Sequence, residues 1–272
     1  MQVKSDWDVK SDEEFYMDEK KQSIKEIKSL FEQTERENWN SLFVRFENDS
    51  RQGVRQLLAR YQKKIAAAQR ECERLEKMLE FEKKYGEEYV CICGIDEAGR
   101  GPFAGPVVAG AVVLPVGLKI EGLNDSKKVA ANKREELFDE IKEKAVSYGI
   151  GMSSPARIDE INILQATYEA MHHAVEDLDV VPDLLLNDAV TIPQIPIKQV
   201  GIIKGDARSL SIAAASIMAK VTRDRLMIEM AELYPEYGFE KNKGYGSAEH
   251  IAALKKYGPC PIHRASFIHH YV

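Results

Sequence analysis

The sequence has no long hydrophobic run and few cysteines, and each absence excludes a class of protein. No apolar stretch among its 272 residues approaches the roughly 20 needed to cross a bilayer, which argues against a membrane protein. None of the four cysteines belongs to a CxxC pair, so a zinc finger or a disulfide scaffold is not indicated. We therefore expect reduced thiols. The acidic start, MQVKSDWDVKSDEEF, is not a secretory signal, and a cytoplasmic location is expected.

Histidine and net positive charge are also scarce. The six histidines form no catalytic grouping, and the formal charge of −6 does not favour a nucleic-acid partner. Between Lys198 and Arg264, however, eleven Lys and Arg residues stand against seven Asp and Glu. This local excess is compatible either with a basic face on an acidic protein or with an ordinary mixed, solvated surface.

Three regions differ in composition. Residues 1–20 are polar and acid-rich, which predicts a loosely ordered tail. Residues 21–86 predict a small helical module, in which a second helix starts after the cap residues 48–50 and ends at Gly86. From residue 89 to residue 272, apolar β-branched runs alternate with helical runs, which predicts an α/β layer fold.

The α/β region has a definite expected order of elements. Strands are expected at residues 89–95, 107–114, 145–152, 183–188 and 199–206, and helices at residues 133–146, 158–178 and 209–235. A tight glycine loop separates the first two strands, so these are expected to form an antiparallel hairpin. The whole sheet is therefore expected to be mixed.

Four carboxylates stand where expected strands end: Asp96, Glu97, Asp188 and Asp206. A single acid in such a place is typical of a surface or capping residue. Ligands of open α/β sheets nevertheless bind at these ends, and four acids in one pocket would repel one another. A divalent cation removes that repulsion, and oxygen-only donors suit Mg²⁺ or Mn²⁺. Because strand neighbours face opposite sides, Asp96 and Glu97 both enter the pocket only if the backbone turns or bulges there.

Five motifs, in this order, resemble bacterial ribonuclease HII, a type 2 ribonuclease H. They are GIDEAGRGPFAGPVVAGAVVL from Gly94, NDSKK from Asn124, KGDARSLSIAAASIMAKVTRD from Lys204, KNKGYGSAEH from Lys241 and HRASF from His263. The resemblance covers residues 89–267. It implies a ribonuclease-H-like mixed β-sheet flanked by helices. It also implies an endoribonuclease that hydrolyses the RNA strand of RNA–DNA hybrids and incises 5′ to single ribonucleotides embedded in duplex DNA.

The resemblance makes the four acids the catalytic and metal-binding set. Two divalent cations, Mn²⁺ or Mg²⁺, about 3.5–4 Å apart would activate water and stabilise the leaving oxygen, so no histidine or lysine base is required. Two positions depart from the family pattern. Asn187 stands where an apolar residue usually precedes Asp188, and Ala265 stands where a basic residue is usual. Asp188 is retained because its spacing to Asp206 fits.

The resemblance also indicates residues that bind the substrate. Glycines let the main chain approach a ribose closely, so Gly99, Arg100 and Gly101 are expected at the 2′-OH, with Arg100 reaching a phosphate. Tyr245 is expected to stack on the sugar at the junction between ribonucleotide and deoxyribonucleotide. The remaining expected phosphate contacts, for which solvated surface is the alternative, are Ser126, Lys127 and Arg208.

Two other functions stay open. A ribonuclease HIII shares the chemistry, but it commonly carries a longer β-containing N-terminal domain and lacks the Gly-Arg-Gly loop. A non-catalytic nucleic-acid-binding scaffold would use the acids only to hold a structural cation. The expected partners are RNA–DNA hybrids and duplex DNA containing ribonucleotides, with no membrane partner and a monomeric chain.

The helical module carries a basic cluster, which motivates two hypotheses. The module either docks on the catalytic domain or extends its grip on nucleic acid. The cluster consists of Arg51, Arg55, Arg60, Lys63 and Lys64.

Overall fold

The computed structural model describes residues 22–272, which fall into two compact units divided between Glu71 and Cys72. The predicted polar tail, residues 1–20, lies outside the described residues. Within residues 22–272, every helix is too short or too polar to span a lipid bilayer.

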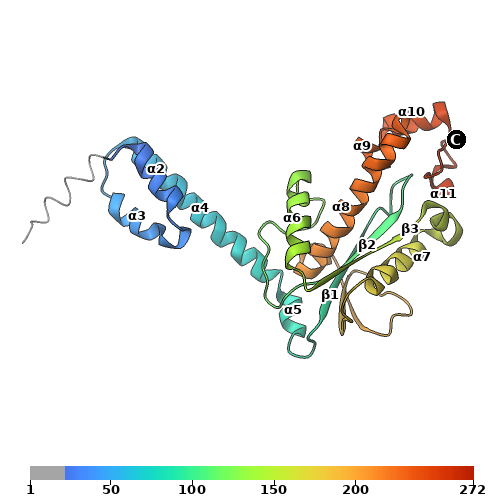
Figure 1. Ribbon diagram of the computed structural model, residues 1–272, viewed down its shortest axis with the longest axis horizontal. Coiled ribbons are helices and arrows are strands. Elements are labelled where there is room, and N and C mark those ends of the chain that lie inside the picture. The colour runs from blue at the N-terminus through green and yellow to red at the C-terminus, as the bar shows by residue number, and fades with distance from the viewer. Residues whose placement is uncertain (1–21) are drawn as a thin grey trace, which may run out of the picture. The chain divides into compact units, whose positions relative to one another are not determined.

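The first unit is helical. It contains α2 (Ile24–Gln33), the 3-10 turn η1 (Arg36–Asn38), α3 (Trp39–Phe46) and the first part of α4 (Gln52–Lys77), as Figure 1 shows. A capping box starts α2, because Ser23 and Glu26 each accept a hydrogen bond from the other's backbone N–H. A buried aromatic cluster lies in the core of this unit, where the rings of Phe31 and Tyr61 are stacked at a centroid distance of 4.3 Å.

The helical prediction for this part of the chain missed two breaks. The first separates α2 from α3, where Trp39 turns back so that its indole N–H donates to the carbonyl oxygens of Phe31 and Thr34 at 3.0 and 2.9 Å. The second separates α4 from α5 (Glu80–Tyr85), which belongs to the second unit. At the second break the carbonyl oxygen of Met78 accepts a hydrogen bond from the backbone N–H of distant Leu210 at 3.0 Å. Such contacts override the continuous helix that local propensity predicts.

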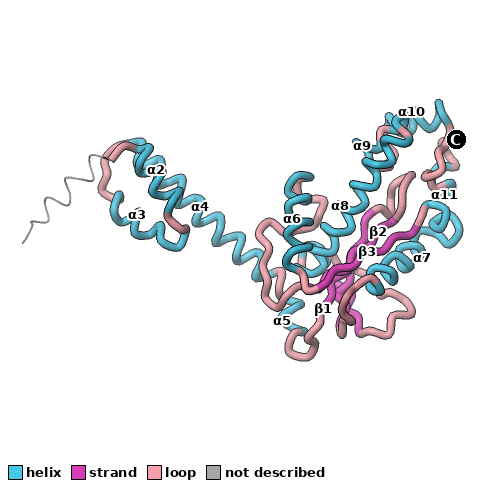
Figure 2. Tube along the Cα trace, viewed as in Figure 1, coloured by secondary structure: helices cyan, strands magenta, loops and turns pink. Residues whose placement is uncertain are grey.

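A mixed five-stranded sheet forms the centre of the second unit. Figure 2 shows strands of this sheet in magenta, with helices around them. The strand order of the sheet is β3-β2-β1-β4-β5. Antiparallel pairing joins β1 to β2 and β2 to β3, while β4 runs parallel to both β1 and β5. The bounds are β1 (Ile92–Ala98), β2 (Val107–Val113), β3 (Ser147–Ser153), β4 (Leu184–Asp188) and β5 (Lys198–Ile202). The predicted mixed sheet and antiparallel hairpin are therefore confirmed.

Helices cover both faces of this sheet. On one face lie α6 (Ala131–Lys144) and α8 (Leu210–Leu233), and on the other lies α7 (Pro155–Glu176), as Figure 1 shows. Helix α8 lies so close to β1 and β2 that glycines face it. A Cβ atom on Gly110 would come 2.5 Å from the carbonyl oxygen of Ala215. This close approach brings side chains of α8 to the end of β1.

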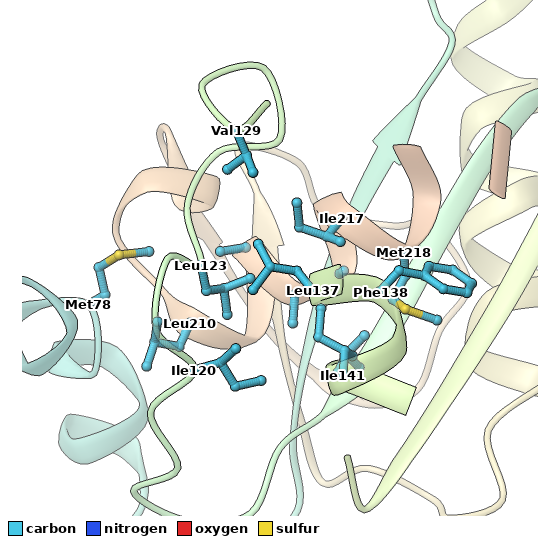
Figure 3. Close-up of a cluster of buried hydrophobic side chains, with 14 of the residues drawn as sticks. Met78, Ile120, Leu123, Val129, Leu137, Phe138, Ile141, Leu210, Ile217 and Met218 are labelled. Carbon is cyan, nitrogen blue, oxygen red and sulfur yellow. The ribbon is translucent and has the colours of Figure 1, made fainter. Parts of the chain in front are cut away.

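The core beneath α8 is aliphatic. Figure 3 shows Leu137, Phe138 and Ile141 of α6 directed toward Ile217 and Met218 of α8, and all five side chains are buried. Burying such side chains supplies the main favourable free energy of folding. The remaining elements are η2 (Gly205–Ala207), η3 (Pro235–Tyr237), α9 (Phe239–Asn242), α10 (Ala248–Tyr257) and α11 (Ala265–Ile268).

Candidate active site

Two of the four predicted acids lie at matching ends of neighbouring parallel strands. The last paired residues of β1 and β4 are Ile95 and Asn187, and Asp96 and Asp188 are the next residue on each strand. Neighbouring strands are about 4.8 Å apart, so the two carboxylates leave the sheet side by side. The strand pairing therefore supports the predicted convergence of these two acids.

Asp206 lies in a turn that is hydrogen-bonded to the side chain of Asp188. The backbone N–H of Gly205 donates to Oδ1 of Asp188 at 2.7 Å, directly after β5. A Cβ atom on Gly205 would come 2.6 Å from Cδ1 of Ile212 and 3.4 Å from Asp188, so a larger residue would require the Ile212 side chain to move. The glycine thus allows the turn that carries Asp206 to lie against the end of β4.

The electrostatics show that the acids share one site. Burial raises the pKa of Asp96 well above its ordinary value, and the charges of Glu97 and Asp188 raise it further. Burial also raises the pKa of Glu97, where Arg100 opposes the shift and Asp188 adds to it. Burial raises the pKa of Asp206 as well, with further contributions from Asp125 and Asp188. Asp188 is thus an electrostatic neighbour of each of the other three predicted acids.

The expected irregularity between Asp96 and Glu97 is absent. Pairing between β1 and β2 continues in register through Ala98, and the left-handed turn follows at Gly99 with φ of +95°. Of the two expected alternatives, a turn or a bulge, the structure therefore has the turn, which lies at Gly99 and not between the two acids. Glu97 lies beyond the last residue of β1 that pairs with β4, so its side chain can approach Asp188 past the end of β4.

A fifth acid, Asp125, was missed by the sequence analysis. Its carboxyl group forms a hydrogen bond with Asp206 and accepts another from the backbone N–H of Lys127 at 2.9 Å. Because two carboxyl groups share the first bond, Asp125 raises the pKa of Asp206. Its place within the NDSKK motif was the available signal, but only the neighbours Ser126 and Lys127 were selected.

The predicted phosphate contacts have different surroundings. Ser126 is buried, and its hydroxyl oxygen lies 2.9 Å from that of Ser216, which also forms a hydrogen bond with Asp96. Lys127 is exposed beside the acids and opposes the raised pKa values of Glu97 and Asp206. Arg208 is exposed, with its guanidinium 4.9 Å from the ring centroid of Phe81.

Two buried arginines hold the Gly99-Arg100-Gly101 loop, and neither was predicted as part of the site. Arg264 is fully buried and donates to the carbonyl oxygens of Gly99, Arg100 and Gly105 at 2.6 to 3.0 Å. Arg223 donates to three further carbonyl oxygens, those of Ala104, Pro106 and Lys243. Planar guanidinium groups suit several simultaneous carbonyl contacts, which lysine cannot make.

Tyr245 lies against this loop. Its ring atom Cε1 is 3.9 Å from the position that a Cβ on Gly101 would take, and the residue is 46% exposed. Its carbonyl oxygen lies 2.9 Å from Nδ1 of buried His250, whose Nε2 lies 2.9 Å from Nε2 of His263. His263 thus supports the backbone at Tyr245 through His250. The structure brings Gly101 and Tyr245 together, as the proposed recognition of one nucleotide step requires.

The donor chemistry of the site fits hard divalent cations. The predicted ligands are all carboxylates, and burial together with repulsion between like charges raises the pKa values of Asp96, Glu97 and Asp206. Within residues 22–272, no three acidic, histidine or cysteine side chains already surround a common point as a metal cage. The fit therefore rests on donor type and uncompensated charge, and the ligand set remains a prediction.

The raised pKa values predict that the folded protein becomes less stable as pH rises. Unfolded carboxyl groups have pKa values of about 4, and the folded protein keeps protons on Asp96, Glu97 and Asp206 to higher pH. Between the two values the folded state binds more protons, so the free energy of unfolding decreases as pH rises. The stabilisation from these protons is fully present below about pH 4, where the three carboxyl groups are protonated in both the folded and the unfolded protein.

Urea unfolding from about pH 4 to about pH 8 checks this expectation. The same measurement on Asp188→Asn isolates the contribution of the site. This variant lacks one repelling charge, so its free energy of unfolding should fall less steeply as pH rises. Mg²⁺ should stabilise the wild type near pH 8 and have little effect near pH 4. Equal slopes for the two proteins would contradict the assignment of repulsion to this cluster.

Comparison with known proteins agrees with this geometry. Residues 93–270 match the family described as Ribonuclease HII, and residues 23–86 match the Ribonuclease HII N-terminal domain. A Ribonuclease HII from Lachnoclostridium phytofermentans is 60% identical over 224 residues, covering 82% of this chain and 88% of that protein. One from Clostridioides difficile is 52% identical over 247 residues, covering 90% and 97% respectively.

A solved structure shares the fold. The crystal structure of ribonuclease H2 from Pyrococcus horikoshii is similar with a TM-score of 0.54 and 31% identity, and the match covers 65% of this chain and 93% of that one. A family match that spans the sheet, the four acids, the Gly99-Arg100-Gly101 loop and Tyr245 leaves one conclusion: the chain belongs to the ribonuclease HII family.

Proposed function

We propose that the protein is a divalent-cation-dependent endoribonuclease that hydrolyses the RNA strand of RNA–DNA hybrids and incises duplex DNA 5′ to single embedded ribonucleotides. The observation that carries the proposal is the convergence of Asp96, Glu97, Asp188 and Asp206 around the end of β4, in a chain of this family. Its expected setting is a cytoplasmic monomer.

The chain's own residues prepare the site for phosphodiester hydrolysis. The four acids would hold two cations, which supply Lewis acidity at the scissile phosphate when bound. Ser216 and the backbone N–H of Gly205 orient Asp96 and Asp188 by hydrogen bonds. Because these contacts exist in the protein alone, the carboxylates are positioned before substrate binds.

The same geometry supports selection of a ribonucleotide. Arg264 binds the carbonyl oxygens of Gly99 and Arg100, which fixes the orientation of these peptide units. The backbone N–H groups of Arg100 and Gly101 form no hydrogen bond within the described part of the chain. They are therefore free to face a 2′-OH, which is the group that distinguishes RNA from DNA.

Replacing Tyr245 by alanine is expected to lower kcat/KM about 10- to 100-fold on duplex DNA containing one ribonucleotide. A stacked aromatic side chain contributes about 1–3 kcal/mol per base or sugar step, which corresponds to this range. On a continuous RNA–DNA hybrid the loss should be smaller, because no junction is required there. Tyr245→Phe retains the ring and is the matched control, with near wild-type activity.

Gel analysis of both substrates, each labelled at one end, tests the function as well as the residue. Metal-dependent incision 5′ to the single ribonucleotide supports the proposal. Cleavage of long hybrids alone would favour a ribonuclease HIII-like activity, and binding without any cleavage would favour a scaffold. Equal loss on both substrates for Tyr245→Ala would contradict its role at the junction.

A further inference from the structure

Helix α4 contains a long stretch that has cations and no acids. Residues 51–70 read RQGVRQLLARYQKKIAAAQR, with no Asp or Glu in a chain whose net charge is −6. Acidic residues return at Glu71, where the first unit ends. Concentration of one charge sign on a short helical segment is typical of a surface that meets a partner of opposite charge.

The cations of this stretch lie on the face of α4 that points away from the unit's core. Val54, Leu57, Leu58 and Tyr61 are buried and define the inner stripe of the helix. At 100° per residue, the opposite face is centred near residue 63. The four exposed cations on that face are Arg55, Arg60, Lys63 and Arg70.

These four side chains lack a close acidic partner among the described residues, although Arg55 helps to lower the pKa of the Asp49 carboxyl group. None of them forms an ion pair within residues 22–272, whereas nearby Arg51 pairs with Asp49 at 2.6 Å. Between the cations, Ala59 and Ala67 contribute to a shallow depression of about 550 Å³. The face offers no exposed aromatic or large aliphatic side chain, which a protein partner would need as an anchor.

We propose that this cationic face of α4 binds the sugar–phosphate backbone of duplex nucleic acid without regard to base sequence. The fifteen residue steps from Arg55 to Arg70 extend about 22 Å along the helix, which matches about six base pairs of duplex. The choice of partner rests on the proposed function, because the chain's substrate is a duplex. The face adds affinity that is electrostatic and therefore depends on salt.

The test uses the full chain with Arg55→Gln, Arg60→Gln, Lys63→Gln and Arg70→Gln combined. Affinity for an all-DNA duplex and for the same duplex with one ribonucleotide is measured by fluorescence anisotropy across a KCl series in EDTA. We expect Kd to rise about tenfold or more near 100 mM salt, equally for both duplexes. The slope of log K against log salt should shrink by about 0.9 for each lost phosphate contact.

A matched control removes the same charge elsewhere, with Lys142, Lys144, Lys255 and Lys256 changed to glutamine. These exposed lysines lie on α6 and α10, and their loss should change Kd and slope much less. Lysine at Arg55, Arg60 and Arg70 should preserve binding, because phosphate contact requires charge and not a particular side-chain shape. Circular dichroism should show the same fold in every variant, since all changes are at exposed positions.

Unchanged Kd and salt slope in the α4 variant would overturn the proposal. An equal loss in the control would also overturn it, because the effect would then belong to net charge. Binding is measured without a cleavage step, so failure of the proposed nuclease function would appear separately, as wild-type protein that binds duplex but never incises it.

Discussion

Replacing Asp188 by asparagine is expected to lower the incision rate by about a thousandfold or more while the fold is kept. Asp188 is an electrostatic neighbour of Asp96, Glu97 and Asp206, so its charge is central to any cation site there. Bound cations contribute several kcal/mol to catalysis of phosphodiester cleavage, and each 1.36 kcal/mol corresponds to a factor of about ten. Asparagine keeps an oxygen that can accept the hydrogen bond from Gly205.

Single-turnover incision in Mg²⁺ and in Mn²⁺ measures this loss, and urea unfolding reports the fold. In EDTA at neutral pH the variant should be at least as stable as the wild type, because one repelling charge is gone. Asp139→Asn, an exposed acid on α6, is the control and should change neither quantity. Near wild-type incision by Asp188→Asn would remove this residue from the proposed site.

Replacing Arg264 by methionine is expected to lower the free energy of unfolding by about 3–5 kcal/mol. The change leaves the carbonyl oxygens of Gly99, Arg100 and Gly105 without their donor. Each unpaired buried carbonyl costs about 1–3 kcal/mol. The total is moderated because removal of the charge relieves a desolvation cost, the same cost that lowers the pKa of Arg264 to about 9.

Arg264→Lys should recover little of this stability, because one ammonium group cannot reach three carbonyl oxygens in different directions. Arg225→Met is the matched control, since Arg225 is an exposed arginine paired with Glu135, and its loss should cost less than about 1 kcal/mol. Selectivity for a single ribonucleotide should fall in Arg264→Lys, measured as the ratio of kcat/KM on junction and hybrid substrates. A stable, fully selective lysine variant would show that the loop does not need this arginine.

Local sequence pattern was sufficient for the five strands, for the three long helices of the second unit and for the position of the acids. Alternating apolar runs predicted all five strands of the sheet, because side-chain periodicity depends only on near neighbours along the chain. The placement of Asp96 and Asp188 directly after such runs was also readable, since a strand end is a local feature. Glu97 and Asp206 were selected by the same pattern, and the motifs added the expected roles of the acids and of the Gly99-Arg100-Gly101 loop.

Tertiary structure decided which side chains complete the site. Asp125 reaches Asp206 from a separate loop, and Glu97 approaches Asp188 without a bulge because β4 ends there. Arg264 binds Gly99 across 165 residues of sequence. Hydrophobic periodicity along the sequence cannot predict such a contact. Its free energy comes from burial and from hydrogen bonds that exist only once the distant segments have folded together.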